Sequence, residues 1–174
     1  MNQPAQTGKH PKGLYVLFFT EMWERFGYYL MVGILFLYMT NSTGKGLPKA
    51  MGADVVGTFI ALVYLTPFIG GLLADRYLGY IKSIFIGGAL MAAGYLTIAL
   101  PGEYTAYIAM GLIIVGNGFF KPNISTLLGN MYNREDLRPL KDNAYNIFYM
   151  GINIGAFFCN FVAAILRNRI GWQA

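Results

Sequence analysis

Five long apolar runs, separated by short polar segments, dominate the chain after a polar start. Each run reaches or approaches the ~20 residues that a transmembrane helix needs, and none alternates apolar and polar residues as a porin strand would. The pattern therefore predicts an all-α integral membrane protein with helices at about residues 14–41, 55–78, 83–100, 104–131 and 143–166. Residues 1–13 are predicted to form a flexible cytoplasmic tail.

Composition supports this class. The chain is 56% hydrophobic and only 12% charged, whereas soluble domains carry about 25% charged residues. The net charge of +5 does not indicate a nucleic-acid partner, because the basic residues lie mostly in loops and form no basic helix face. With the N-terminus inside, the cytoplasmic side would hold Lys9, Lys12, Arg76, Lys82, Arg134, Arg138 and Lys141. The outer side would hold only Lys45, Lys49, Arg167 and Arg169, so an N-in orientation is favoured.

Few residues are available for metal or nucleophile chemistry. Cys159 is the single cysteine, which excludes an intrachain disulfide, and the single histidine, His10, lies in the polar tail. No metal-ligand motif, nucleotide-binding loop or nucleophile elbow is present. We therefore expect no metal, no cofactor and no catalytic residue, although a membrane-embedded enzyme that uses glutamates as acid and base is an alternative hypothesis.

The first apolar run contains a charged stripe. On a helix, Glu21, Glu24, Arg25 and Tyr28 follow at i, i+3, i+4 and i+7 and share one face, with Tyr29 at its edge. Ionisable residues at membrane depth are energetically expensive and by default indicate function. The stripe is the strongest candidate site in the sequence.

Lys121, in the fourth run, is the other charge well inside a predicted helix, and it brings the formal sum of the four charges to zero. We therefore expect the first and fourth helices to face each other across a polar cavity, with Lys121 paired to Glu21 or Glu24. Two interpretations are open. The charges could form a static knot that locks two helices, or the excess carboxylate could exchange a proton near neutral pH, because two close carboxylates do not ionise independently.

Polar and small residues inside the other helices complete the picture. Tyr64 lies midway along the second helix, and Asn117 and Asn123 flank Lys121. Tyr145, Asn146, Tyr149 and Asn153 recur on the fifth helix. A single Tyr or Asn in such a helix more often makes an interhelical hydrogen bond than a ligand contact. Pro67 predicts a kink in the second helix. Gly151 with Gly155 and Gly70 with Ala74 predict close helix packing.

These residues together resemble a known family, the proton-dependent oligopeptide transporters of the major facilitator superfamily. The matching segments are Glu21-x-x-Glu24-Arg25-Phe26-x-Tyr28-Tyr29, Gly118-Phe119-Phe120-Lys121-Pro122-Asn123 and Phe148-Tyr149-x-x-Ile152-Asn153-x-Gly155. The loop Gly71-x-x-Ala74-Asp75-Arg76-x-x-Gly79-x-x-Lys82 resembles the motif of the wider superfamily. The matches fall in order and span nearly the whole chain.

The resemblance implies a twelve-helix core of two six-helix halves with a substrate site between them. Residues 14–174 would then form most of the N-terminal bundle, with 171–174 approaching a sixth helix and the C-terminal half as a partner of this chain. The implied activity is proton-coupled symport of di- and tripeptides across the cell membrane, with protons as the coupling ion. A structural or regulatory membrane fragment without transport is a further alternative.

The resemblance also implies residue roles. Glu21, Glu24 and Arg25 would form the proton-linked cluster, with Lys121 as a partner that trades ion pairs when a carboxylate is protonated. Substrate would contact Arg25, Tyr28, Tyr29, Tyr64, Lys121, Tyr149 and Asn153. Asp75 and Arg76 would act in gating, or would form a polar turn that anchors two helices.

One departure concerns the cargo. Many bacterial members follow the two tyrosines with glycine, one residue, then arginine, where this chain has Leu30-Met31-Val32. The second arginine is missing at Val32. This leaves an alternative with the same fold but a different cargo, such as nitrate, another organic anion or a modified amino acid.

Overall fold

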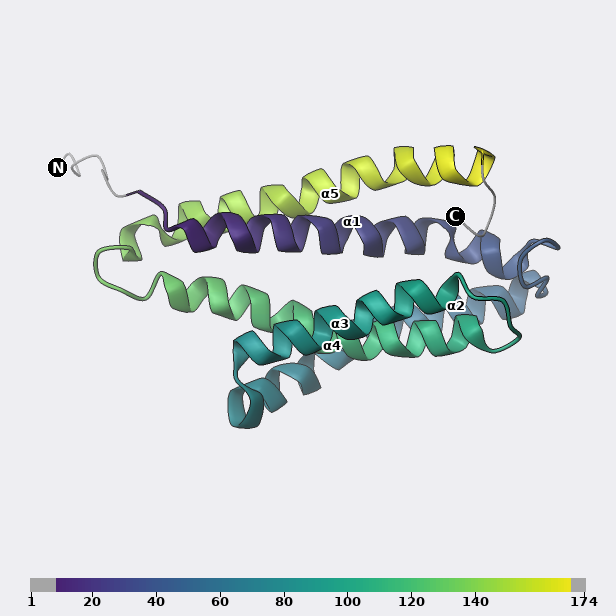
Figure 1. Ribbon diagram of the computed structural model, residues 1–174, viewed down its shortest axis with the longest axis horizontal. Coiled ribbons are helices and arrows are strands. Elements are labelled where there is room, and N and C mark those ends of the chain that lie inside the picture. The colour runs from purple at the N-terminus through teal and green to yellow at the C-terminus, as the bar shows by residue number, and fades with distance from the viewer. Residues whose placement is uncertain (1–8, 170–174) are drawn as a thin grey trace.

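The computed structural model describes residues 9–169, and these residues form a bundle of five α-helices in which each helix runs opposite to the one before it in the chain (Figure 1). The helices are α1 (Lys12–Thr40), α2 (Lys49–Leu73), α3 (Tyr80–Ile98), α4 (Thr105–Met131) and α5 (Lys141–Arg169). A π-helical turn (Ala74–Leu78) links α2 to α3, and a 3-10 turn (Arg138–Leu140) precedes α5. The predicted all-α fold is confirmed. Residues 1–8 of the expected tail and the expected approach to a sixth helix at 171–174 lie outside the described residues.

The largest difference from the expected helix limits is at the start of α2. This helix begins at Lys49 and not near residue 55: Pro48 is its N-cap, and the residues from Lys49 to Asp54 are already helical. Pro67 lies within α2 without ending the helix. The polar turn expected after α2 is the π-helical turn, which ends at Gly79 with a φ of 76°.

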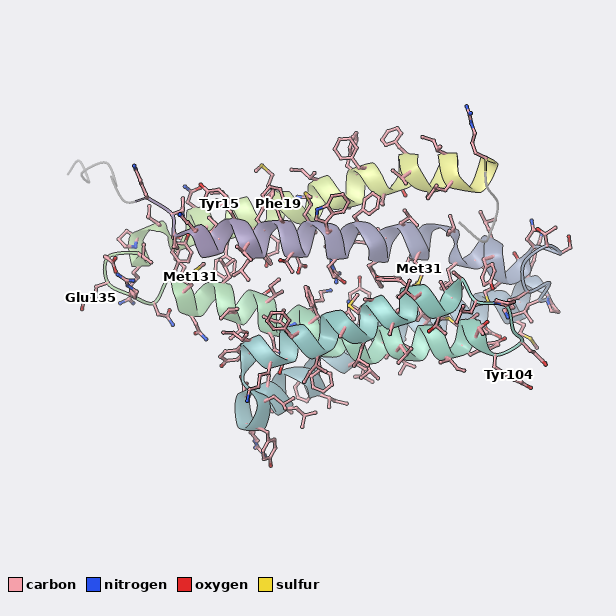
Figure 2. The ribbon with its side chains drawn as sticks, in the orientation of Figure 1. Tyr15, Phe19, Met31, Tyr104, Met131 and Glu135 are labelled. Carbon is pink, nitrogen blue, oxygen red and sulfur yellow. The ribbon has the colours of Figure 1, made fainter. Side chains whose placement is uncertain are left out.

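Three of the described helical segments are long and apolar enough to cross a membrane: Lys49–Leu78, Tyr80–Ile98 and Arg138–Leu166. The other two helices, α1 and α4, carry the charged and amide residues at the centre of the predicted site, which lower their hydropathy. Large apolar side chains cover the outside of the bundle, including Tyr15 and Phe19 of α1, which are 52% and 54% exposed (Figure 2). Such an exterior suits a lipid environment.

Helix α5 packs along α1 (Figure 1). Gly155 faces the backbone of α1, and a methyl group placed on it would collide with the carbonyl oxygen of Met22. A methyl group on Gly151, one turn earlier, would lie 2.9 Å from the ring of Phe18. The close packing predicted for this glycine pair is thus confirmed, since only residues without a Cβ allow the two backbones to approach this closely.

Helix α4 is the centre of the second group of helices, with α2 and α3 both packed along it. Gly70 of α2 lies against the carbonyl oxygen of Gly118, and a methyl group on Gly87 of α3 would lie 2.6 Å from the carbonyl oxygen of Gly116. The hydroxyl of Thr66 donates a hydrogen bond of 3.0 Å to the carbonyl oxygen of Ile114. The middle of α4 is therefore held on two sides.

Within residues 9–13 of the expected tail, α1 already begins at Lys12, and His10 contacts other parts of the bundle. The hydroxyl of Tyr132, at the end of α4, lies 2.7 Å from Nδ1 of His10, and the Asn143 amide lies 3.4 Å from Nε2 of the same ring. The histidine that the sequence assigned to a polar tail thus links the start of α1 to the connection between α4 and α5.

We predict that Gly155→Ala weakens the contact between α1 and α5. The added methyl group meets backbone and not a movable side chain, so we expect destabilisation by about 1–3 kcal/mol, seen as a lower melting temperature in detergent. Gly111→Ala in α4 is the matched control, because a methyl group there meets nothing within 4 Å. Equal melting temperatures for the two variants would contradict the packing described.

Candidate functional site

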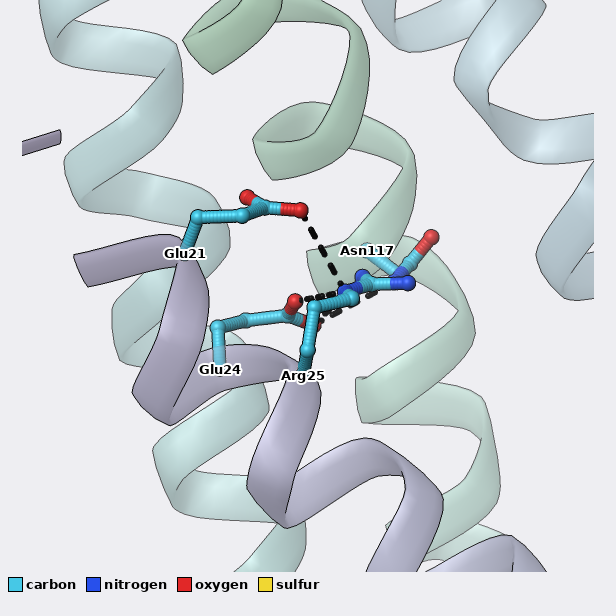
Figure 3. A network of polar contacts seen from close by, with 4 residues as sticks. All are labelled: Glu21, Glu24, Arg25 and Asn117. Carbon is cyan, nitrogen blue, oxygen red and sulfur yellow. Dashed lines mark hydrogen bonds and ion pairs between the residues drawn. The ribbon is translucent and has the colours of Figure 1, made fainter. Parts of the chain in front are cut away.

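Glu21, Glu24 and Arg25 form one charge cluster on the inner face of α1 (Figure 3). The buried residues of α1 recur every three or four positions and include Glu21, Arg25 and Tyr28 in the same row as apolar residues. The side chains of Glu21 and Arg25 are both 3% exposed, and that of Glu24 is 8% exposed. The shared face predicted from the spacing is therefore confirmed, and it points into the bundle.

Arg25 is the cation that both glutamates share. Its Nε and Nη2 donate hydrogen bonds to the two carboxylate oxygens of Glu24, the second over 2.7 Å, and its Nε lies 3.4 Å from Oε1 of Glu21. The guanidinium carbon also lies 5.1 Å from the centre of the Tyr28 ring. A planar guanidinium suits this task, because its fixed fork of donors can serve a bidentate carboxylate and a second acceptor together.

Lys121 does not form the ion pair expected for it. Among residues 9–169, no carboxylate lies within 4.0 Å of its ammonium group. Instead, Nζ lies 4.9 Å from the centre of the Tyr64 ring on α2, a cation–π contact. The expected pairing is thus wrong for this conformation, in which Arg25, on the same helix as the glutamates, holds both oxygens of Glu24 and lies near one oxygen of Glu21. Lys121 still acts on the cluster through its charge, from beyond contact distance.

Asn117 makes the hydrogen bond that joins the cluster to α4. Its Nδ2 donates to Oε1 of Glu24 over 3.5 Å, and the side chain is fully buried (Figure 3). Within residues 9–169, its Oδ1 has no hydrogen-bond partner, and neither does Oε2 of Glu21. The sequence placed Asn117 beside Lys121 but did not assign it to the site. The available signal was its position one helical turn before a membrane lysine, on the same face.

The residues expected to contact substrate fall into two groups. Tyr28 is buried beside Arg25, and Tyr29 is half-buried with its ring 5.4 Å from that of Tyr28. Tyr64 and Tyr149 are 65% and 54% exposed, and Asn153 is also exposed. The ring of Tyr149 stacks on that of Tyr145 of its own helix. The structure thus brings Tyr28 and Tyr64 to the cluster and its lysine, whereas Tyr149 and Asn153 present open surface on α5.

Asp75 and Arg76, the predicted gating pair, lie exposed in the π-helical turn Ala74–Leu78. Ala74 is the buried residue of this turn. The backbone N–H of Gly79 donates to the carbonyl oxygen of Ala74 over 2.8 Å and closes the turn. Both charged side chains are therefore held at the end of the bundle, away from the α1 cluster.

A cavity of about 350 Å³ lies beside the cluster, between α1, α3 and the end of α5. Its lining is apolar apart from two tyrosines, and the hydroxyl of one of them, Tyr95, is buried with no hydrogen-bond partner in the part of the chain that the structure describes. None of the predicted substrate residues lines it. Its lining residues are Phe26, Gly27, Leu30, Met31, Ile34, Leu35, Tyr38, Tyr95, Ile98, Ala99 and Leu166.

The fold and the site define a helical membrane protein with a buried charge cluster on one helix that is hydrogen-bonded to a second helix. The sequence profile of the POT family matches residues 81–174, which is more than half of the chain. The chain belongs to the POT family.

Proteins similar to this chain agree with that assignment. A di-/tripeptide transporter of Lactococcus lactis subsp. lactis (strain IL1403) is 40% identical over 169 residues, which are 94% of this chain and 34% of the relative. Dipeptide and tripeptide permease A of Klebsiella pneumoniae (strain 342) is 39% identical over 179 residues, 99% of this chain and 35% of the relative. The chain thus spans about a third of the length of the curated relatives it matches.

A solved structure shows the same fold. The crystal structure of a peptide transporter POT in complex with sulfate superposes with a TM-score of 0.90 at 41% identity, covering 97% of this chain and 35% of that one. The predicted N-terminal bundle of a major facilitator fold is therefore confirmed.

We predict that Arg25→Met destabilises the bundle strongly. The change leaves two buried carboxylates without their shared cation, and breaking a buried pair in this way costs about 3–5 kcal/mol. The control is Arg134→Met, whose guanidinium pairs with Asp136 at 3.0 Å but is 72% exposed. Removing such a surface pair changes stability by about 0–1 kcal/mol. Melting temperatures in detergent separate the two, and a stable Arg25→Met would show that the cluster does not depend on its arginine.

Proposed function

We propose that this chain forms the N-terminal helices of a secondary active transporter that carries di- and tripeptides together with protons by alternating access. The observation that carries the proposal is the buried cluster of two glutamates and one arginine in a POT-family chain. Named relatives support the cargo, because they are di-/tripeptide transporters and dipeptide and tripeptide permeases.

The coupling follows from charge balance. Glu21, Glu24, Arg25 and Lys121 sum to zero, so a proton that binds Glu24 leaves the group with a charge of +1. In a region of low dielectric such an excess attracts an anion strongly, and the terminal carboxylate of a peptide supplies one. Protonation also removes the negative charge that holds Arg25 on Glu24, so that Arg25 can turn to that carboxylate. Lys121, which has no ion pair among the described residues, can bind the same carboxylate. Proton and peptide then bind together because each neutralises the other.

The remaining assignments extend the same scheme. Tyr28, Tyr29, Tyr64, Tyr149 and Asn153 would contact the peptide, with the open faces of Tyr64 and Tyr149 turned toward the C-terminal half of the transporter. Asp75 and Arg76 would meet that half at the gate.

For the orientation, an N-terminus in the cytoplasm is supported by the basic residues near the start of α1 and in the α2–α3 and α4–α5 connections. These three regions lie on the side of the bundle opposite Tyr104 (Figures 1 and 2). The lipid bilayer of the cell (inner) membrane would surround the apolar exterior. A non-peptide cargo is not favoured by the named relatives, despite the missing arginine at Val32.

We predict that Glu24→Gln abolishes proton-driven accumulation of a dipeptide. The amide cannot take up the proton, so an inward proton gradient no longer changes the charge of the cluster. The assay uses the transporter that contains these helices, reconstituted in liposomes with an alkaline interior. Glu135→Gln, in the exposed α4–α5 connection (Figure 2), is the matched control and should accumulate dipeptide normally. Full accumulation by Glu24→Gln would refute the proton role.

The cargo is tested separately. Unlabelled dipeptides should compete with the uptake of a labelled dipeptide, whereas nitrate and free amino acids should not. The physical reason is that a peptide offers both a carboxylate for the cations and an extended body for the tyrosines. Competition by nitrate alone would instead favour the anion alternative.

A further inference from the structure

We propose that Asn117 is a positioning residue that keeps Glu24 bound to α4 in both protonation states of the carboxyl group. The inference rests on the proposed proton coupling and adds to it a residue with no assigned role. Three observations support it: the full burial of Asn117, its bond to Glu24, and an amide oxygen that has no partner.

The first step concerns the bond in the charged state. A carboxylate only accepts hydrogen bonds, and the amide Nδ2 of Asn117 donates one to Oε1 of Glu24 over 3.5 Å. This distance is at the long limit for such a bond, which suits a contact that is made and exchanged. Within the described residues it is the side-chain hydrogen bond that links the cluster to α4.

The second step concerns the unpartnered oxygen. A buried amide oxygen without a donor is unfavourable, because it has lost its hydrogen bonds to water and gained nothing in return. Oδ1 of Asn117 is in this position. The site therefore holds an acceptor next to Glu24 that is unused while Glu24 is charged.

The third step concerns the hydrogen bond between Glu24 and Asn117 after Glu24 is protonated. Protonated Glu24 carries an O–H group that must donate. The cations beside it, Arg25 and Lys121, have no acceptor to offer, whereas a half-turn of the Asn117 amide presents Oδ1. The proton stays on Glu24, and the hydrogen bond between the two side chains reverses its direction. The bond from Glu24 to α4 thus survives when its ion pair with Arg25 is lost.

Glu21 is the competing acceptor, since its Oε2 is also buried and unpartnered. A proton shared between Glu21 and Glu24 would remain on α1 and would leave the link to α4 unmade. The difference matters because Asn117 lies one turn before Lys121. A hydrogen bond through Asn117 keeps Lys121 at the same position relative to the α1 cluster when Glu24 is protonated.

The experiment compares Asn117→Val with Asn117→Thr in the transporter that contains these helices. The two replacements have nearly the same shape, but the threonine hydroxyl both donates and accepts, whereas valine does neither. Any effect of shape or folding is therefore shared, and their difference isolates the hydrogen bond. Melting temperatures in detergent check that the two variants fold equally.

The first readout does not depend on transport. In a pH-difference infrared spectrum, the C=O stretch of protonated Glu24 is the carboxylic-acid band that Glu24→Gln removes. We expect this band at a higher frequency in Asn117→Val than in the wild type, because the acid has lost its hydrogen-bond acceptor, and at an intermediate or wild-type frequency in Asn117→Thr. An unchanged band in Asn117→Val would overturn the inference and would favour Glu21 as the acceptor.

The second readout is proton-driven dipeptide accumulation in liposomes. Loss of one hydrogen bond to a charged or acidic group changes an equilibrium by about tenfold, so we expect Asn117→Val to accumulate about tenfold less and Asn117→Thr to recover most of the loss. Equal impairment of both variants would mean that the amide acts through shape alone, and the inference would fail. An infrared shift without any proton-driven uptake by the wild type would instead overturn the proposed function and leave the bond to Asn117 standing.

Discussion

The sharing of one buried guanidinium between two buried carboxylates is the interaction on which the rest of the structure depends. Arg25 binds Glu24 through two N–H groups and reaches Glu21 as well. The three side chains leave a net charge of −1 inside the bundle, where charges are poorly screened. Burial at this depth is tolerable only if the remaining charge is balanced from nearby, and Lys121 on α4 provides that balance without contact.

Helix packing holds the α1 cluster and Lys121 of α4 in place. Glycines let α5 approach α1 at Met22, next to the cluster, and let α2 and α3 approach the middle of α4 near Asn117. The bundle is thus made of two tightly packed groups, α1 with α5 and α4 with α2 and α3. Direct contact between α1 and α4 is much slighter, and at the site the hydrogen bond from Asn117 to Glu24 joins the two groups. Such a junction can change when a charge changes.

The cation–π contact of Lys121 likewise leaves this residue able to change its partner. An ammonium group that rests on the Tyr64 ring keeps a favourable partner while remaining free of a carboxylate. Its stem is half-buried between helices and its charge still acts on the glutamates. A lysine held in this way can move to an anion at a small energetic cost, whereas a lysine already in a buried ion pair could not.

Local features of the site were predictable from the sequence. The spacing of Glu21, Glu24, Arg25 and Tyr28 puts them on one face of any α-helix, and Glu21 and Arg25 are i, i+4 neighbours whatever the tertiary fold. The apolar runs likewise fix five helices, and the Gly151 and Gly155 pair marks a close contact. The start of α2 was not predicted, because the expected limit followed the apolar run and not Pro48, the residue before the helix. The contact between His10 and Tyr132 was not predicted, because it joins segments distant in the sequence.

The sequence by itself thus determined that this is a helical membrane protein of the POT family with a charged stripe on its first helix. Tertiary structure alone decided which groups of the other helices lie near those charges. A charge count shows that Lys121 balances the excess carboxylate, but it cannot rank Arg25, Lys121 and Asn117 as neighbours of Glu24. That ranking is set by how far apart α1 and α4 are held and how each is rotated, which follows from glycine contacts along helices distant in sequence. In the structure, Glu24 accepts hydrogen bonds from Arg25 and Asn117, and the ammonium group of Lys121 lies over the ring of Tyr64.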